Sequence, residues 1–172
     1  KVLPDENRMI NGFTDYEELT RTRRLIMRSY KLPGNRLRLL HPNENRGAVT
    51  IDEERDYHFR YVLEDNFGNR RTYQFIVKGK RQDIPEYKPE ANEMLYWNRT
   101  NVIQKPGMEL VVPRYYVYED VPLRTDMRGD SSHIAFDYIL DAGRTPIHSY
   151  CDLSIGLRHM PVADTTKYYI VQ

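Results

Sequence analysis

Segment 57–77 constrains the fold more than any other part of the sequence. It holds two runs in which aromatic and aliphatic residues alternate with polar ones, on either side of the polar stretch Asp-Asn-Phe-Gly-Asn at 65–69. Strict alternation is the period of a strand that buries one face. Asp, Asn and Gly tolerate the backbone conformations of a tight turn. The pattern predicts a β-hairpin, with Phe59 and Phe75 pointing into a small β-sandwich.

Short strands and turns are expected along most of the remaining chain. Fourteen tyrosines among 172 residues favour strands over helix bundles. One short helix through about residue 19 is predicted from Thr14 and Glu17, which have the spacing of a capping box. The other predicted strands lie at 25–27, 37–39, 48–51, 94–97, 108–112, 115–118, 123–127, 133–140, 150–157 and 168–171.

A change in composition at 81–92 predicts a boundary between two modules. This stretch, RQDIPEYKPEAN, has two prolines, mixed charge and no periodicity, which is typical of a semi-rigid linker. We place the boundary near residue 85. The expected fold is therefore all-β, with two β-sandwich modules in tandem: residues 1–84, built around the hairpin at 57–77, and residues 85–172.

Charge and hydropathy indicate which partners to expect. The formal net charge is +1, with 16 Lys and Arg against 12 Asp and Glu in residues 1–80, and 10 against 13 in residues 81–172. The net charges of the two halves are therefore small, whereas a nucleic-acid-binding protein usually carries a strongly basic patch. No apolar run reaches the length of a membrane span. The single cysteine, Cys151, shares a strand face with Leu153 and Ile155 and is expected to pack as a small hydrophobe.

A search for catalytic and metal-binding motifs assigns no residue to either role. The sequence contains no HExxH, HxH, CxxC, GxSxG or glycine-rich phosphate loop. His133 and Asp137 have an H-x-x-x-D spacing, but on a strand such residues lie about 13 Å apart, too far to share one ion. The acidic residues between Asp52 and Asp56 leave two alternatives: a calcium site, or a solvated loop end before a strand, which we favour.

Two groups of residues are candidates for binding. Arg21, Arg23, Arg24 and Arg28 form either an anion-binding strip or, as we favour, a solvated and ion-paired strand face. Five aromatic residues form either a stacking platform for sugars or, more often in such proteins, sandwich packing. These five are Tyr96, Trp97, Tyr115, Tyr116 and Tyr118.

Four stretches carry a resemblance to a known family. They read PGNRLRLLHPNENRGAVTIDEERDYHFRYVLEDNFGN, NVIQKPGMELVVP, YEDVPL and PIHSYCDLSIGLRHMPV. Together they resemble the region downstream of the catalytic domain in lysostaphin-type (LytM-like) zinc metallopeptidases of Bacteroidetes. The resemblance implies immunoglobulin-like β-sandwich modules in a periplasmic or cell-envelope protein whose peptidase domain cleaves peptidoglycan. It also implies that strands of both modules lie beyond the ends of this sequence, so that each module is incomplete.

The zinc signature of that family is missing from the sequence. Its H-x-G-x-D-like element and later H-x-H do not occur, so no catalytic or metal residue is carried over, and zinc is expected only in a catalytic domain elsewhere in the polypeptide. The expected function is that of non-catalytic modules that position or pack against that domain, with peptidoglycan as a further expected partner. The alternative is a stand-alone glycan- or protein-binding module of the cell surface, and an enzyme with an unrecognised site is a third reading.

Overall fold

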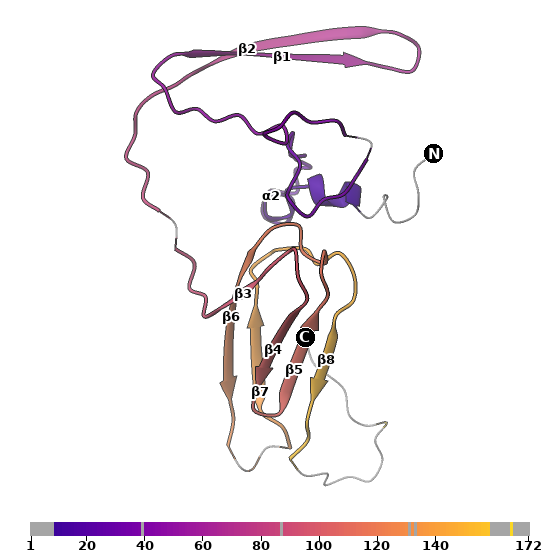
Figure 1. The fold of residues 1–172 in the computed structure, drawn as a ribbon, viewed down its shortest axis with the longest axis vertical. Helices are drawn as coiled ribbons and strands as arrows, with labels where there is room; N and C mark the ends of the chain where they lie inside the picture. Colours follow the sequence, from indigo (N-terminus) through magenta and orange to yellow (C-terminus); the bar gives the residue numbers. More distant parts are fainter. Residues whose placement is uncertain are drawn as a thin grey trace. The chain divides into compact units, whose positions relative to one another are not determined.

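The chain has an all-β fold with very little helix (Figure 1). The computed structural model describes residues 9–38, 40–86, 88–130, 132, 134–158 and 166. Its residues form two compact units. The larger unit comprises residues 1–47 and 89–172, and the hairpin unit comprises residues 48–88.

This division differs from the predicted one in where it places the first 47 residues. The predicted boundary near residue 85 lies close to the point at which the chain passes back into the larger unit, at Pro89. Segment 1–47, however, groups with the second half of the chain, and not with the hairpin.

The larger unit contains two three-stranded antiparallel sheets. One has the strand order β3-β6-β7 and the other β4-β5-β8. The strands are β3 (Glu93–Leu95), β4 (Asn101–Lys105), β5 (Met108–Val112), β6 (Val121–Arg128), β7 (Asp137–Asp141) and β8 (Asp152–Ile155). The turn between β4 and β5 is closed by Gly107, which has a positive φ of 75°.

Both sheets contribute to one hydrophobic core. It consists of Leu95, Ile103, Val112, Val117, Val121 and Leu123. Val112 is 0% exposed and Leu95 is 2% exposed. Since β3 and β6 belong to one sheet and β4 and β5 to the other, this core lies between the sheets, which fits a β-sandwich.

The N-terminal segment contains the α-helix α2 (Tyr16–Thr22), after a short 3₁₀ turn at Asn11–Phe13. Its N-cap is Asp15, whose side chain accepts a hydrogen bond from the backbone N–H of Glu18 at 3.0 Å. The predicted helix exists, but the cap lies one residue later than the predicted Thr14. A carboxylate competes well with a hydroxyl for this position, and Glu18 then occupies the third helical position.

The N-terminal segment meets the loop before β6 at Gly34 and is held together internally by Asn35. The backbone N–H of Gly34 donates to the carbonyl of Tyr118 at 2.6 Å, and a Cβ at Gly34 would lie 2.9 Å from backbone oxygens of that loop. The buried Asn35 donates from its side-chain amide to the carbonyl of Met9 and accepts from the backbone of Leu37. Leu37 then packs with Met9 and Phe13 in a second, smaller core.

The hairpin unit contains the predicted hairpin. Strands β1 (Asp56–Glu64) and β2 (Arg70–Lys78) pair antiparallel over nine residue pairs, with Phe59 opposite Phe75. Asp65 organises the turn: its carboxylate accepts hydrogen bonds from the backbone of Phe67 and from both backbone and side chain of Asn69. The Asn69 side-chain bond is the main cause that lowers the pKa of Asp65.

The burial predicted for the hairpin is wrong. Strands β1 and β2 form a two-stranded sheet, and no other described strand pairs with it. Phe75 is 36% exposed and Tyr73 is 65% exposed, while Phe59 is half-buried because its ring stacks on Phe75 at 5.1 Å. The predicted strands at 25–27, 37–39 and 48–51, which would have supplied a second layer, do not form among the described residues.

Most of the predicted strands of the second half are present in the structure. The strand at 108–112 is confirmed to the residue, and β3, β6, β7 and β8 overlap the predicted ranges at 94–97, 123–127, 133–140 and 150–157. Strand β4 was not predicted. Residues 115–118 form a loop, because Tyr115 has a positive φ of 70°. The predicted strand at 168–171 lies outside the described residues. No helix of the described residues is long and apolar enough to cross a membrane.

Replacing Leu95 with alanine tests the core of the larger unit. We expect Leu95→Ala to lower the free energy of unfolding by about 2–5 kcal/mol, because a fully buried leucine leaves a cavity between the sheets. Leu25→Ala makes the same change at a side chain that is 67% exposed and should cost less than about 0.5 kcal/mol. Urea unfolding followed by Trp97 fluorescence measures both. Equal effects would mean that this core does not hold the unit together.

Candidate functional site

Three of the five aromatic residues singled out from the sequence lie together on two neighbouring loops. Tyr96 and Trp97 directly follow β3, and Tyr115 lies in the loop between β5 and β6. The backbone N–H of Tyr115 donates to the carbonyl of Trp97 at 2.9 Å, which ties the loops together. The rings of Trp97 and Tyr115 contact each other with centroids 6.1 Å apart.

Arginine side chains lie over the rings of Tyr96 and Tyr115. The guanidinium carbon of Arg99 lies 3.8 Å from the ring centroid of Tyr96. Those of Arg36 and Arg114 lie 4.7 and 4.6 Å from the centroid of Tyr115. Such distances are those of cation–π contacts. We call Arg36, Arg99, Arg114, Tyr96, Trp97 and Tyr115 the arginine–aromatic cluster. Its guanidinium groups occupy ring faces on which a sugar would stack.

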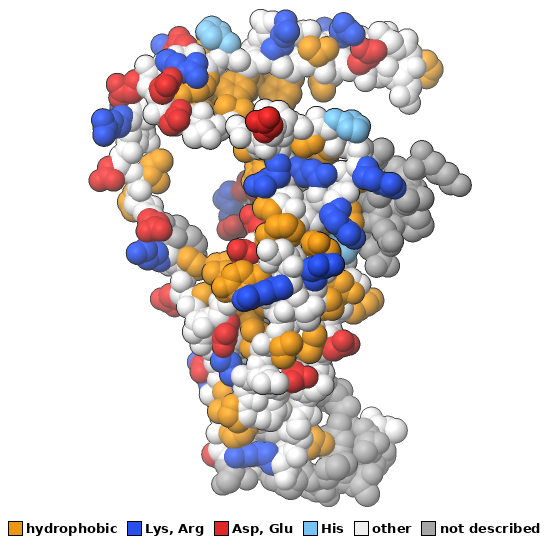
Figure 2. Space-filling model, viewed as in Figure 1, with side chains coloured by type: hydrophobic (Ala, Val, Ile, Leu, Met, Phe, Trp, Pro, Cys, Tyr) orange, Lys and Arg blue, Asp and Glu red, His pale blue; other side chains and the backbone are white. Residues whose placement is uncertain are grey.

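The cluster carries unbalanced positive charge. Within the part of the chain that the structure describes, no carboxylate forms an ion pair with Arg36, Arg99 or Arg114. The carboxylate of Asp120 accepts a hydrogen bond from the backbone N–H of Trp97 at 3.3 Å and does not pair with these arginines. On the visible face of the larger unit, Lys and Arg side chains gather near the end where α2 lies and alternate with hydrophobic ones (Figure 2).

The other two aromatic residues do not join this cluster. Tyr116 packs against the core between the sheets. Tyr118 is only 6% exposed, and its hydroxyl shares a hydrogen bond of 2.6 Å with Nδ1 of His148. Burial raises the pKa of Tyr118 to about 12. At neutral pH this phenol therefore stays protonated.

A groove of about 550 Å³ borders the Tyr118–His148 pair. Its lining includes two exposed aromatic or aliphatic residues of the 146–150 loop, Ile147 at 47% and Tyr150 at 97% exposure, and Tyr16 from α2. A phenol with so high a pKa is a poor general base at neutral pH. The groove offers aromatic surface and hydrogen-bonding groups.

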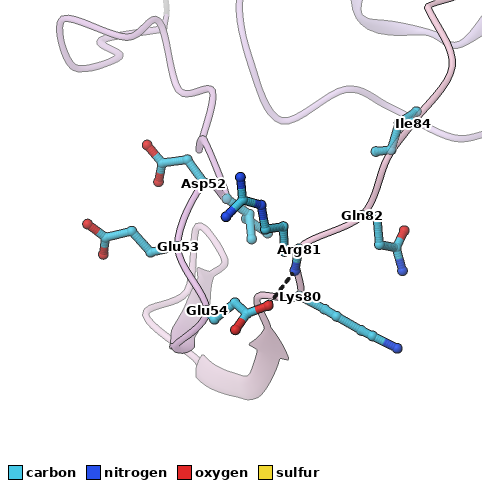
Figure 3. A pocket seen from close by; sticks show the side chains of 8 residues that line it. Asp52, Glu53, Glu54, Lys80, Arg81, Gln82 and Ile84 are labelled. Atoms are coloured by element: carbon cyan, nitrogen blue, oxygen red, sulfur yellow. Dashed lines mark hydrogen bonds between the residues drawn. The ribbon is translucent and has the colours of Figure 1, made fainter.

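The acidic residues near Asp52 line a second groove, which lies within the hairpin unit and has a volume of about 620 Å³ (Figure 3). Their carboxylates are used locally: Asp52 accepts from the hydroxyl of Tyr57, Glu53 pairs with Arg55 at 2.7 Å, and Glu54 accepts from the backbone N–H of Arg81. In Figure 3, Asp52 and Glu53 point away from Glu54. The arrangement agrees with the favoured reading of a solvated loop end.

No group of three or more His, Cys, Asp or Glu side chains that could hold a metal ion occurs among the described residues. His133 lies outside them. Cys151 is half-buried and packs against the core between the sheets, and burial is the main cause that raises the pKa of its thiol. A protonated, half-buried thiol is a poor nucleophile.

Comparison with known proteins gives one match. Residues 92–172 match the family model of the Zu5-like domain. This match covers β3 to β8 and somewhat less than half of the chain. Searches of curated proteins and of solved structures found no match. The region that matches carries Arg99 and Arg114, while Arg36 lies in the preceding segment.

The arginines of the cluster and His148 were not identified as site residues from the sequence. A local signal exists for two of them, because Arg114 directly precedes Tyr115 and Arg99 follows Trp97 by two positions. Arg36 and His148 reach Tyr115 and Tyr118 only through tertiary contacts, which no local pattern encodes.

A high-pH series tests the environment of Tyr118. Its pKa in the folded state is about 12, above the value of about 10 in an unfolded chain. The protonated phenol of Tyr118 therefore contributes fully to the free energy of unfolding below pH 10. This contribution, of up to about 2–3 kcal/mol, is lost as the pH rises toward 12. We expect Tyr118→Phe to lack this part of the loss, which urea unfolding at pH 9, 10 and 11 measures.

Tyr150→Phe is the matched control for that series, because Tyr150 is 97% exposed. It should lose stability with pH as the unmodified protein does. Identical pH dependence in Tyr118→Phe and in the unmodified protein would contradict the burial of the phenol.

Proposed function

We propose that this chain is a non-catalytic accessory region, of immunoglobulin-like β-sandwich character, that positions the catalytic domain of a cell-envelope peptidoglycan metallopeptidase. The supporting observation is the apolar face of the hairpin, which no other described strand covers. Zinc belongs, on this proposal, to a catalytic domain of the same polypeptide. The periplasm or cell envelope is then its location, and peptidoglycan a further partner.

The two faces of the hairpin differ sharply in chemistry. The pairing register places Tyr57, Phe59, Tyr61 and Leu63 with Val77, Phe75, Tyr73 and Arg71 on one face. We call this the apolar face. The opposite face carries the charged pairs Asp56 with Lys78 and Glu64 with Arg70. Only the first face has the composition of a buried layer.

An isolated two-stranded hairpin is marginally stable in water, and one face normally packs on another layer. On the apolar face, Tyr61 is 44%, Leu63 is 64% and Tyr73 is 65% exposed. Contiguous exposed apolar side chains of this kind mark contacts with another protein surface. A neighbouring domain of the same polypeptide would supply that surface.

The resemblance of the sequence to the region downstream of LytM-like catalytic domains suggests which domain that is. The missing H-x-H motif agrees with a role outside catalysis. The second candidate function is glycan or protein binding at the cell surface. It is favoured by the groove beside Tyr118 and His148, where the exposed rings of Tyr16 and Tyr150 flank hydrogen-bonding groups.

Two substitutions of neighbouring residues on opposite faces test the accessory role in the parent protein. Tyr73→Arg puts a charge on the apolar face, and we expect it to lower hydrolysis of purified murein at least severalfold because it disrupts docking. Thr72→Arg puts the same charge on the opposite face and should leave hydrolysis nearly unchanged. Both side chains are exposed, so circular dichroism should detect no unfolding. Equal activity of the two variants would contradict the proposal.

The chain by itself should not hydrolyse peptidoglycan. A turbidity assay on purified murein with added zinc is expected to give the rate of a heat-inactivated control, because the motifs that activate a metal-bound water are missing. Lysis above that control would support an unrecognised active site. Co-sedimentation with murein that Tyr150→Ala abolishes, with the fold intact, would favour the glycan-binding alternative.

A further inference from the structure

We propose that the arginine–aromatic cluster binds the phosphate groups of a polyanionic ligand. The guanidinium groups of Arg36 and Arg114 lie over the ring of Tyr115, which contacts the ring of Trp97. The guanidinium group of Arg99 lies over Tyr96, the residue before Trp97. This proposal stands independently of the accessory role, because it concerns a different surface and is tested on this chain alone.

The contacts with the rings leave the arginines able to bind an anion. A cation–π contact does not use a guanidinium N–H group in a hydrogen bond to an oxygen, so these groups remain available as donors. Those donors match the oxygens of a phosphate in pairs. Because the rings already hold the side chains, less conformational entropy is lost on binding than for an unrestrained arginine.

The absence of competing carboxylates separates these arginines from others in the chain. Arg70 is held by Glu64 at 2.7 Å, and Arg124 faces Asp141 at 3.7 Å. No carboxylate of the described residues pairs with Arg36, Arg99 or Arg114. Their positive charge is therefore not neutralised within the described part of the chain.

The number of positive charges favours a ligand with more than one phosphate, because a single phosphate carries at most about two negative charges at neutral pH. Arg36 and Arg114 approach the same ring, so their guanidinium carbons are separated by no more than the sum of the two distances, about 9 Å. Arg99 adds a third charge on Tyr96, the residue next to Trp97. Neighbouring phosphates of a linear polyphosphate can contact two such groups at once.

One acidic residue has a contact with the cluster and limits where the ligand can lie. The carboxylate of Asp120 accepts a hydrogen bond from the backbone N–H of Trp97 at 3.3 Å and would repel an anion. The ligand is therefore expected over Arg36, Arg99 and Arg114 and away from this carboxylate.

Binding can be followed at the cluster itself. The chain has a single tryptophan, so its indole N–H gives one resonance in a ¹H–¹⁵N spectrum. Inorganic tripolyphosphate is the probe, titrated at low and at moderate salt. We expect the Trp97 resonance to shift on saturation and the affinity to fall as salt rises, because exposed charges are screened.

Substitutions distinguish binding at the arginine–aromatic cluster from a non-specific effect of net charge. Arg36→Gln, Arg99→Gln and Arg114→Gln should each weaken tripolyphosphate binding by about two- to fivefold, the range of exposed charge pairs, and the triple variant by more. Arg124→Gln, with the same change of charge in the same unit, should bind as the unmodified protein does. Circular dichroism and the thermal midpoint check the fold of each variant.

Four results would overturn the proposal. Unchanged binding by the triple variant would show that the three arginines do not bind the probe. An equal loss of affinity in Arg124→Gln would show that only the net charge of the protein matters. Orthophosphate binding as tight as tripolyphosphate binding would exclude a polyanion site. Binding to vesicles of anionic lipid without binding to tripolyphosphate would point to a membrane surface instead.

Discussion

The burial of six aliphatic side chains between two three-stranded sheets is the interaction on which the larger unit depends. The loop from β5 to β6 leaves the core at Val112, returns to it at Val117, which is 1% exposed, and ends at Val121. Because these three anchors fix the loop, Tyr115 and Tyr118 have defined positions between them. Tyr115 joins the arginine–aromatic cluster, and Tyr118 meets His148 and the segment at Gly34. Both candidate binding sites therefore depend on the same aliphatic core.

The hairpin unit shows what a strand pattern does and does not specify. Alternation of period two sets which side chains share a face, and the nine-pair register between β1 and β2 preserves it. The pattern has no information on what covers that face. Stacking among Phe59, Tyr61, Tyr73 and Phe75 reduces the exposure of the rings only in part. A hydrophobic layer that depends on a partner surface is consistent with an accessory role.

The sequence was most informative where local chemistry decides the structure. The turn at 65–69 and the strand at 108–112 follow from residues within a few positions, and both were predicted correctly. The predicted strand at 37–39 does not form because a long-range contact prevails: Leu37 packs on Met9 and Phe13 instead of pairing in a sheet. Of the predicted strand at 25–27, only Met27 pairs, in an isolated bridge with Thr14. The aromatic residues were found as a group, but their separation into a cationic cluster and a buried Tyr118 depends on the positive φ of Tyr115 and on His148, which lies 30 residues further along the chain.

The arginine–aromatic cluster belongs to the larger unit as a whole and not to the Zu5-like match alone. Arg99 and Arg114 lie in the matched region 92–172, but Arg36 belongs to the N-terminal segment. That segment is held by the hydrogen bond from Gly34 to Tyr118, at a glycine where any side chain would collide with the loop backbone. Arg36 follows Gly34 by two residues. The contact that packs the segment against the loop therefore also places the guanidinium group of Arg36 over the ring of Tyr115. A region comprising only β3 to β8 would retain two of the three charges, and the site we propose is complete only when residues before β1 are packed against those strands.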